Sequence, residues 1–422
     1  MSTSTRSEAG ALDVDLANPD TFAEEIPHAF FARKRREDAV FWHPEAPPRS
    51  GFWAVTKFDD VATVSADWRT YSSELGHVGL EELADDELEV RQSMLETDPP
   101  KHTRLRRIVS PLFTPRAVAQ YEGYARELAR ETLDAALEEE EFDFIEAIAM
   151  PFPINVLLRI LGCPREDAPK LVELSDRMIA NTDPDLSTLV GDKEDTSAYR
   201  LLPFRSPAGP ELFEYAHALA AKRRAEPGDD LISKLVHAEV DGDRLTEREL
   251  DNFFTLLVIA GNETTRQTLA HAMLALMEHR DQWQLLRDDP SLLPIAVEEF
   301  IRWASPVFHF RRTATRDAEL GGAAIRRGDK VVLWYVSADF DEDAFPDPYR
   351  FDVTRHPNDH AAFGPGGPHF CLGAWLARLE VRVMLEELLP RIADMELTGP
   401  VRRIRSNFAN GFKQMPVRVK LV

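Results

Sequence analysis

The hydrophobic and polar positions of this chain recur mostly with the period of an α-helix. The longest run, Thr246 to Glu278, predicts one helix of about 50 Å at 1.5 Å per residue. Shorter runs predict further helices at Pro115–Glu140, Pro153–Leu161, Glu166–Ala180, Glu211–Glu226, Ser291–Trp303 and Leu372–Leu389. Runs rich in β-branched and aromatic residues predict strands at Phe52–Thr56, Phe308–Thr315, Lys330–Val336 and near Pro416–Leu421. The pattern therefore predicts a mainly α protein with small β-sheets.

Two long stretches show no strong periodicity. Ser72–Pro100 is acidic and contains Gly76 and Gly79, and Asn181–Pro210 is rich in proline, aspartate and serine. Long loops in compact enzymes are often lids or binding loops, and the alternative is plain surface disorder.

Composition adds limits to this picture. No Gly/Ser-rich linker or internal repeat divides the 422 residues, so we expect a single domain over 1–422, with about the first 15 residues disordered. The longest apolar stretch, around Phe253 to Ala260, is far shorter than the ~20 residues that span a bilayer. Together with the polar N-terminus, it predicts a cytoplasmic protein without a membrane anchor. The net charge of −23 argues against nucleic acid and anionic membranes as partners.

The chain has two cysteines, Cys163 and Cys371, and the second has an unusual setting. The segment Phe363–Gly373 contains several glycines and prolines and leads directly into a predicted helix, whose N-terminus favours a thiolate. No second cysteine or histidine pair lies nearby, so zinc and iron–sulfur clusters are poorly supported, whereas heme iron needs a single axial thiolate. The alternative is a buried, inert thiol.

A second candidate lies in the middle of the longest helix. In Ala260-Gly261-Asn262-Glu263-Thr264-Thr265 the small residues leave room for a flat ligand. The Thr264 hydroxyl can bond a carbonyl one turn back, and Glu263 can relay protons. The alternative is an ordinary threonine pair with a surface glutamate.

The segment Phe363–Gly373 resembles the heme-ligand signature of the cytochromes P450, with one extra residue before His369. Further matching segments are Glu299-Phe300-Ile301-Arg302, the acid–threonine motif above, Asp98–Arg107 and Phe310–Asp317. The resemblance runs roughly from Phe52 to Val419. It implies the cytochrome P450 fold, a triangular helical prism with a long central I helix.

The resemblance also implies roles for individual residues. Cys371 is the expected thiolate ligand of heme b (iron protoporphyrin IX), Thr264 is expected to stabilise the oxygen species at the iron, and Glu263 to supply protons. The remaining cofactor-binding residues are Ala260 beside the macrocycle and the expected propionate partners His102, Arg106, Arg312 and His369. Arg311 is the competing choice for Arg312. Three residues are expected to form a buried structural charge network, namely Glu299, Arg302 and Arg350.

Substrate and electron partners follow from the same resemblance. The expected pocket lining is apolar and comprises Leu257, Val258, Gly261, Val307, Phe308, Phe310 and Phe408, with Phe412 nearby. Similar family members act on steroid side chains, methyl-branched lipids or monoterpenes, which implies hydroxylation of a hydrophobic small molecule with O2. A ferredoxin and its reductase are the implied electron donors, docking on a basic face formed by Lys101, Arg104, Arg107 and Arg378. No flavin or nicotinamide fingerprint is present in the sequence.

Three functions remain open at this stage. A ferredoxin-dependent monooxygenase needs the acid–threonine pair, present here as Glu263 and Thr264. A peroxide-driven heme-thiolate peroxygenase often carries a substrate-anchoring arginine instead, and Arg266 is expected to face elsewhere. A non-catalytic heme-binding protein needs neither a substrate pocket nor a proton relay.

Overall fold

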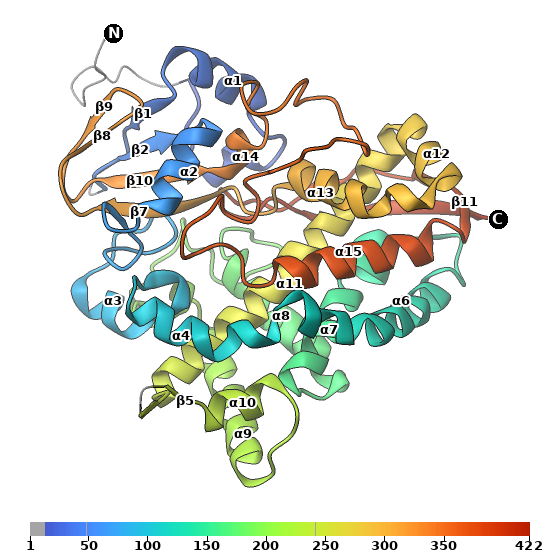
Figure 1. Cartoon of the computed structure of the whole chain (residues 1–422), viewed down its shortest axis with the longest axis horizontal. Helices are drawn as coiled ribbons and strands as arrows, with labels where there is room; N and C mark the ends of the chain where they lie inside the picture. Colours follow the sequence, from blue (N-terminus) through green and yellow to red (C-terminus); the bar gives the residue numbers. More distant parts are fainter. Residues whose placement is uncertain (1–12, 48, 241) are drawn as a thin grey trace.

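Helices carry most of the structure, as the sequence pattern predicts (Figure 1). This computed structural model describes residues 13–47, 49–240 and 242–422. Its α-helices are α1 (His28–Glu37), α2 (Phe58–Ala66), α3 (Asp85–Arg91), α4 (Lys101–Val109), α5 (Pro115–Val118), α6 (Glu122–Ala136), α7 (Pro151–Leu161), α8 (Ala168–Ile179), α9 (Gly209–Ala225), α10 (Leu231–His237), α11 (Glu247–Glu278), α12 (Arg280–Asp288), α13 (Leu293–Ala304), α14 (Tyr335–Ala338) and α15 (Ala374–Leu388).

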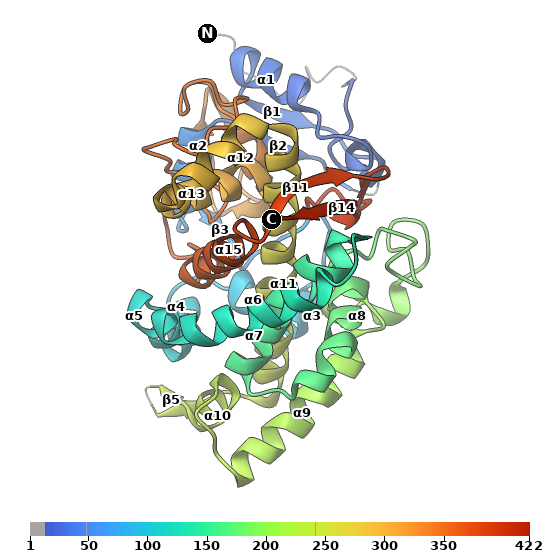
Figure 2. The same cartoon turned by 90° about the vertical axis from the view of Figure 1, so that its right-hand side faces the viewer.

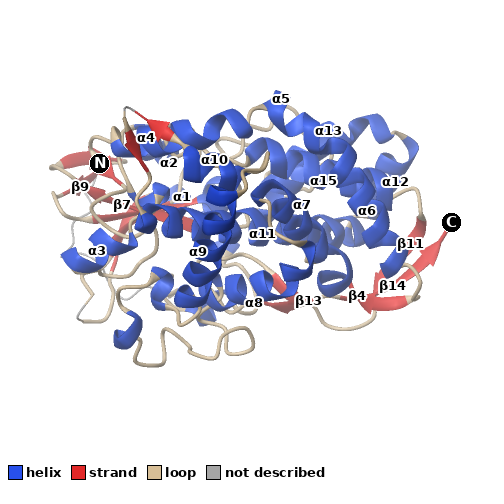
Figure 3. Cartoon of the chain, turned by 90° about the horizontal axis from the view of Figure 1, so that it is seen from below, coloured by secondary structure: helices blue, strands red, loops and turns tan. Residues whose placement is uncertain are grey.

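The strands are short and form small sheets. They are β1 (Val40–His43), β2 (Phe52–Val55), β3 (Tyr71–Ser72), β4 (Glu141–Asp143), β5 (Glu239–Val240), β6 (Asp243–Arg244), β7 (His309–Ala314), β8 (Ala318–Leu320), β9 (Ala323–Ile325), β10 (Lys330–Trp334), β11 (Ile392–Leu397), β12 (Arg402–Arg403), β13 (Phe412–Gln414) and β14 (Pro416–Leu421). Figure 3 shows them gathered toward two ends of the molecule, with helices between.

Helix α11 is the central element. Its 32 residues begin at a capping box, in which the Thr246 hydroxyl accepts from the N–H of Glu249 at 3.1 Å and the Glu249 carboxylate accepts from the N–H of Thr246 at 2.9 Å. It contacts α7, α8, α9, α13 and α15, and Figures 1 and 2 show it passing through the body of the molecule. A helix surrounded in this way is apolar on most of its circumference.

The largest sheet has the strand order β1-β2-β10-β7-β3. Strand β10 pairs antiparallel with β7, with Val331 opposite Arg312 and Trp334 opposite His309. One face of this sheet packs with the N-terminal segment in a cluster that includes Phe22, Phe31 and Trp334. The sheet thereby fixes which residues of β7 face the molecular interior.

Several predicted boundaries differ from the structure. The predicted helix Pro115–Glu140 is broken by a 3-10 turn at Ala119–Tyr121 and ends at Ala136, because the chain must then turn into β4, which pairs with β14. The strand predicted at Lys330–Val336 ends at Trp334, where α14 begins. The stretch Ser72–Pro100, expected to be irregular, contains α3.

The N-terminal stretch expected to be disordered falls only partly within the structure. Residues 1–12 lie outside the described residues. Residues 13–15 are placed, and Asp13 forms an ion pair with Arg33 at 2.6 Å. Among the helices of the described ranges, none combines the length and apolar character that crossing a membrane requires.

Candidate active site

Cys371 lies at the end of a loop whose shape requires glycine. Its N–H donates to the carbonyl of Phe363 at 2.8 Å, which closes the loop. Gly364, Gly366 and Gly367 all have φ between +75° and +82°. At Gly367 a Cβ atom would also lie 2.0 Å from the carbonyl oxygen of Ser65, at the end of α2. The glycine-rich sequence thus seats the loop against α2 and positions Cys371 immediately before α15.

The surroundings of the Cys371 thiol act on its pKa in opposite directions. Burial raises its pKa, whereas the N–H groups of Gly373 and Ala374 and the charges of Arg106 and Arg378 lower it. The lowering effect expected from the helix N-terminus is present, but in the protein alone burial outweighs it and the pKa of Cys371 is raised. A bound metal cation would supply the additional positive charge that a thiolate needs there.

Four buried or partly buried cationic or imidazole side chains gather near this loop. We call His102, Arg106, Arg312 and His369 the donor cluster. The rings of His102 and His369 lie 4.3 Å apart, and Arg106 donates to the carbonyl of Phe370 at 2.6 Å. The Nε2 atoms of both histidines lack a hydrogen-bond partner. Across the described parts of the chain, no member of the donor cluster forms an ion pair with a carboxylate.

The pKa values of the donor cluster indicate that its members lack an anionic partner. Burial, and then the charges of neighbouring arginines, lower the pKa of His102 to about 4 and that of His369 to about 2. Burial also lowers the pKa values of Arg106 and Arg312. Buried donors without an anion are costly, so this arrangement fits a ligand that carries carboxylates.

Arg311 and Arg312 are neighbours in strand β7 and therefore lie on opposite faces of it. Neighbouring residues of a strand point to opposite faces. Arg311 donates to the carbonyl of Glu81 at 2.6 Å, whereas the charge of Arg312 acts on both His102 and His369. Arg312 therefore belongs to the donor cluster and Arg311 does not.

The middle of α11 presents a small exposed surface. Ala260 is exposed although its neighbour Ile259 is buried, and the Thr264 hydroxyl donates to the Ala260 carbonyl at 3.0 Å. Leu257, three residues earlier, lies on the same helix face. The helix continues without a break through these residues. Ala260 leaves space at this point for a flat ligand.

Glu263 is buried rather than on the surface. It is 1% exposed and forms an ion pair with Arg266, and its other oxygen accepts from Gln267 at 2.8 Å. Arg266 also pairs with Asp176 of α8 at 2.7 Å. The charged side chains of Glu263, Arg266 and Asp176 thus link α11 to α8.

Four residues that the sequence placed near the substrate pack elsewhere. A Cβ atom on Gly261 would lie 2.9 Å from Leu157, so its missing side chain allows α11 to approach α7. Val258, on the same face, is fully buried in the main core. Phe308 is 0% exposed with its ring 4.6 Å from that of Phe22, and the Phe412 ring packs on His271. The pocket assignments of Gly261, Val258 and Phe308 are therefore wrong, and Phe412 is a core residue.

Of the other predicted lining residues, Leu257 is buried at 8% exposure, whereas Val307, Phe310 and Phe408 remain partly exposed. Val307 pairs in an isolated bridge with Ala409, and the Phe310 ring lies 5.8 Å from that of Phe408. Phe408 also lines a cavity of about 140 Å³ together with His309. Sequence reasoning missed His309, although alternation within Phe308–Thr315 placed it opposite Phe310.

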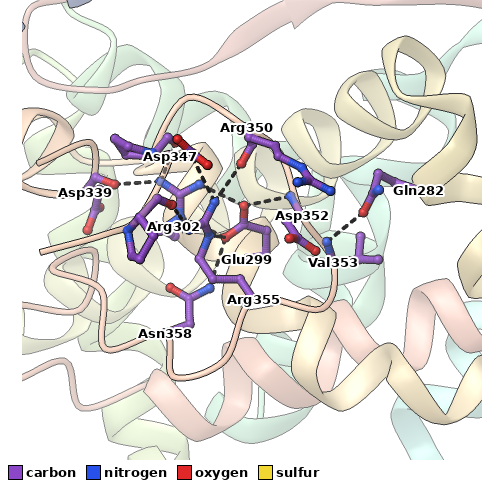
Figure 4. A network of polar contacts seen from close by, with 12 residues as sticks. Gln282, Glu299, Arg302, Asp339, Asp347, Arg350, Asp352, Val353, Arg355 and Asn358 are labelled. Atoms are coloured by element: carbon purple, nitrogen blue, oxygen red, sulfur yellow. Dashed lines mark hydrogen bonds and ion pairs between the residues drawn. The ribbon is translucent and has the colours of Figure 1, made fainter. Parts of the chain in front are cut away.

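The buried charge network uses a different arginine from the one predicted (Figure 4). Arg302 donates twice to Glu299, at 2.8 Å each, and both side chains are fully buried. The third partner is Arg355, whose Nε donates to Glu299 at 3.1 Å. Arg350 is exposed and contributes its backbone carbonyl, which accepts from Arg355 at 2.7 Å. The prediction of Arg350 as the partner of Glu299 is wrong.

The surface beside α15 contains a groove of about 540 Å³. Trp375 and Phe370 are among its lining residues, 48% and 38% exposed. Two arginines of the expected basic face are already paired, Arg378 with Glu298 at 2.6 Å and Arg104 with Glu249. This face is therefore less basic than the sequence suggested.

The residues present fit a heme. Cys371 is a single free thiol, and the described residues contain no group of three or more potential metal ligands. The orphaned nitrogens of the donor cluster suit propionates, and the exposed Ala260 suits a flat ring. Cys371, the donor cluster and Ala260 are the residues that would hold the group.

Comparisons with known proteins agree with this fit. The family model "Cytochrome P450" matches residues 52–393. The chain is 40% identical to a methyl-branched lipid omega-hydroxylase of Mycobacterium tuberculosis, covering 97% of this chain and 95% of the relative. It is 37% identical to a steroid C26-monooxygenase of Rhodococcus jostii, covering 96% and 84%.

Solved structures give the same result for the fold. A Mycobacterium marinum cytochrome P450 in complex with pseudoionone superposes with a TM-score of 0.88 at 39% identity, covering 98% of this chain and 100% of that one. Its fold, the matched family model and the named relatives together establish that the chain belongs to the cytochrome P450 family and is a P450 monooxygenase.

Proposed function

We propose that this enzyme binds heme b through the thiolate of Cys371 and hydroxylates a hydrophobic terpenoid, steroid or branched lipid. The observation that carries the proposal is the donor cluster, four buried or partly buried donors without an anionic partner, beside a free cysteine at the start of α15. When bound, the heme supplies the activation of O2, with one oxygen atom entering a C–H bond and the other leaving as water after uptake of two electrons and two protons.

The chain's own residues bind and orient the cofactor and move protons. His102, Arg106, Arg312 and His369 neutralise the propionates, and Ala260 lets the macrocycle approach α11. The hydroxyl of Thr264, held by the Ala260 carbonyl at 3.0 Å, donates a hydrogen bond into the space over Ala260 when it rotates away from that carbonyl. Glu263 supplies protons once its ion pair with Arg266 opens.

Electrons come from a ferredoxin and its reductase in this proposal. The groove beside α15, with the exposed rings of Trp375 and Phe370, is the surface on which such a partner would approach Cys371. Because Arg104 and Arg378 are already paired within the chain, apolar contact contributes more to this docking than the sequence suggested.

One alternative function is a peroxide-driven peroxygenase. Such an enzyme would use a free arginine to anchor a substrate carboxylate over the heme. Arg266, the arginine nearest Thr264 in sequence on α11, is buried and paired with both Asp176 and Glu263. This pairing favours the monooxygenase. A second alternative, a non-catalytic heme protein, would need neither the acid–threonine pair nor the cavity at Phe408.

The cytoplasmic location of the protein stays a prediction from the sequence.

Our proposal for the substrate class rests on the apolar residues expected to line the pocket. Leu257, Phe310 and Phe408 are aliphatic or aromatic and favour binding by close packing. The relatives that act on methyl-branched lipids and steroids, and the structure with pseudoionone, support a branched or terpenoid-derived substrate.

The test is a carbon monoxide difference spectrum of the reduced protein. We expect the long-wavelength Soret band typical of thiolate ligation in the wild type and its loss in Cys371→Ser. Cys163→Ser is the matched control, because Cys163 is a half-buried thiol whose pKa burial raises to about 12. A thiolate band that survives in Cys371→Ser, or disappears in Cys163→Ser, would refute the ligand assignment.

A further inference from the structure

A small cavity beside β7 contains an unusual histidine. The cavity has a volume of about 140 Å³, well above the ~10–15 Å³ that one water needs. Its walls come from the segment His77–Glu81, the irregular stretch that follows α8, the segment Ser406–Phe408 and His309 of β7.

His309 has no hydrogen-bond partner on either ring nitrogen, although it is only 1% exposed. Its ring is held by packing, with the ring centroids of Trp334 and Phe408 at 4.8 Å and 5.6 Å. Strand alternation places it on the same face as Arg311 and Thr313, which bond the carbonyls of Glu81 and Leu75. His309 therefore faces the segment that forms the cavity wall.

Other polar side chains around the cavity are already engaged. His77 accepts from the N–H of Gly79 at 3.0 Å and contacts Glu96 at 3.2 Å. Thr182 donates to the carbonyl of Arg405 at 2.7 Å, and Asn407 donates to the carbonyl of Ala17 at 2.9 Å.

The arginines of the cavity are also occupied by carboxylates. Arg205 pairs with Glu87 at 2.9 Å, and Arg49 lies 3.4 Å from Glu45. Their charges are compensated within the chain, which disfavours an anionic ligand. Apart from the Nε atom of Arg205, the buried side-chain nitrogens of the cavity that lack a hydrogen-bond partner are the two of His309, and leaving them unpaired is costly.

The chemistry of His309 defines what would satisfy it. Burial lowers its pKa to about 3, so the ring is neutral and offers one N–H donor and one acceptor nitrogen. A hydroxyl can accept from the donor or donate to the acceptor, and a carbonyl oxygen can accept from the donor. A hydrocarbon satisfies neither nitrogen.

Phe408 connects this cavity to the candidate active site. Its ring contacts His309 on one side and Phe310 on the other, the latter at 5.8 Å. Phe310 shares its strand face with Arg312 of the donor cluster. A long ligand that passes Phe408 can therefore lie in the cavity at one end and beside the cofactor-binding side of β7 at the other.

We propose that this cavity is a subsite for a neutral oxygen-bearing end group of the substrate, a hydroxyl or carbonyl, and that His309 is the residue that selects for it. The substrate is then an elongated oxygenated terpenoid or steroid that is oxidised at its apolar end. This inference rests on the proposed function, because it assumes that the enzyme hydroxylates a molecule of this class.

The experiment compares matched ligands on the heme-loaded enzyme. Farnesol, the corresponding hydrocarbon farnesene and the corresponding acid are titrated into wild type and into His309→Phe and His309→Gln. Binding is followed by the spin-state shift and by isothermal calorimetry. His271→Phe is the control, since His271 is another buried histidine with an unpartnered Nε2, packed on Phe412 away from the cavity.

We expect wild type to prefer the alcohol over the hydrocarbon, and His309→Phe to reduce this preference by about 3- to 10-fold, the loss of one hydrogen bond. His309→Gln should restore much of the preference, and His271→Phe should leave it unchanged. Product analysis should show oxidation of farnesol at the end remote from the hydroxyl.

Two results would overturn the inference while leaving the proposed function standing. One is equal affinity for alcohol and hydrocarbon in wild type with normal hydroxylation, and the other is an unchanged preference in His309→Phe. Tightest binding of the acid would show instead that the cavity takes an anion. Absence of hydroxylation with every ligand, together with a missing thiolate band, would refute the proposed function itself.

Discussion

The guanidinium of Arg355 lies 3.1 Å from the buried carboxylate of Glu299, which also accepts from Arg302. Arg355 also donates to the carbonyls of Pro346 and Arg350, at 2.6 Å and 2.7 Å. One side chain thus connects α13 to the irregular segment that leads toward the Cys371 loop. Figure 4 shows that segment folded around the ion pair.

Replacement of Arg355 tests this relationship. Arg355→Leu leaves Glu299 buried with one cation fewer and removes the donors to the carbonyls of Pro346, Asp347 and Arg350. We expect the free energy of unfolding to fall by about 3–5 kcal/mol. Urea denaturation followed by tryptophan fluorescence measures the change.

Arg350→Leu is the matched control for this experiment. Its side chain is exposed and its backbone carbonyl is unaffected by the substitution, so we expect a change within about 0.5 kcal/mol. A larger loss for Arg350→Leu than for Arg355→Leu would contradict the network described here.

Thr264→Ala separates substrate binding from the use of electrons. The variant keeps the apolar pocket residues and loses the hydroxyl held by the Ala260 carbonyl. We expect unchanged substrate affinity, with much of the reducing power diverted to hydrogen peroxide. Thr268→Ala, which removes the next hydroxyl on the same helix, should remain coupled. Product formed per NADH consumed decides between these outcomes, and full coupling in Thr264→Ala would exclude the proposed role.

Glu263→Gln tests the proton supply. Glutamine keeps the size of the side chain and can still accept from Arg266 and Gln267, so the fold should be preserved. We expect turnover to fall on the order of 100-fold, with a larger solvent isotope effect. Asp176→Asn removes a carboxylate from the same guanidinium and is the control. Equal losses in both variants would show that the ion network, and not proton transfer from Glu263, limits turnover.

The sequence was most informative where a local signal determines the structure. The capping box at Thr246 and Glu249 fixes the start of α11, and the glycines before Cys371 are required by left-handed backbone angles. In both places neighbouring residues decide the conformation, so no knowledge of distant segments is needed.

The sequence was least informative where the direction of a side chain depends on distant elements. Helix α11 is surrounded by other helices, so its period does not distinguish the face toward α7, with Gly261 and Val258, from the face with Leu257 and Ala260. The choice between Arg350 and Arg355 depends on the path of an irregular segment. His309 was missed because a lone histidine among apolar residues resembles any core position.

Acid should weaken the fold through His271. Burial, and then the charge of Arg403, lower its pKa to about 3, whereas an unfolded histidine titrates near 6.5. Below about pH 6.5 the unfolded chain therefore binds a proton that the folded chain does not, and stability falls as the pH falls toward 3. Each such histidine contributes about 1.4 kcal/mol per pH unit to the slope of the unfolding free energy against pH.

His271→Phe keeps an aromatic ring against Phe412 and removes this proton, so its unfolding free energy should decline less steeply between pH values of about 6 and 4. Urea unfolding of both proteins across this range measures the two slopes, and equal slopes would mean that His271 titrates in the folded enzyme as it does in the unfolded chain.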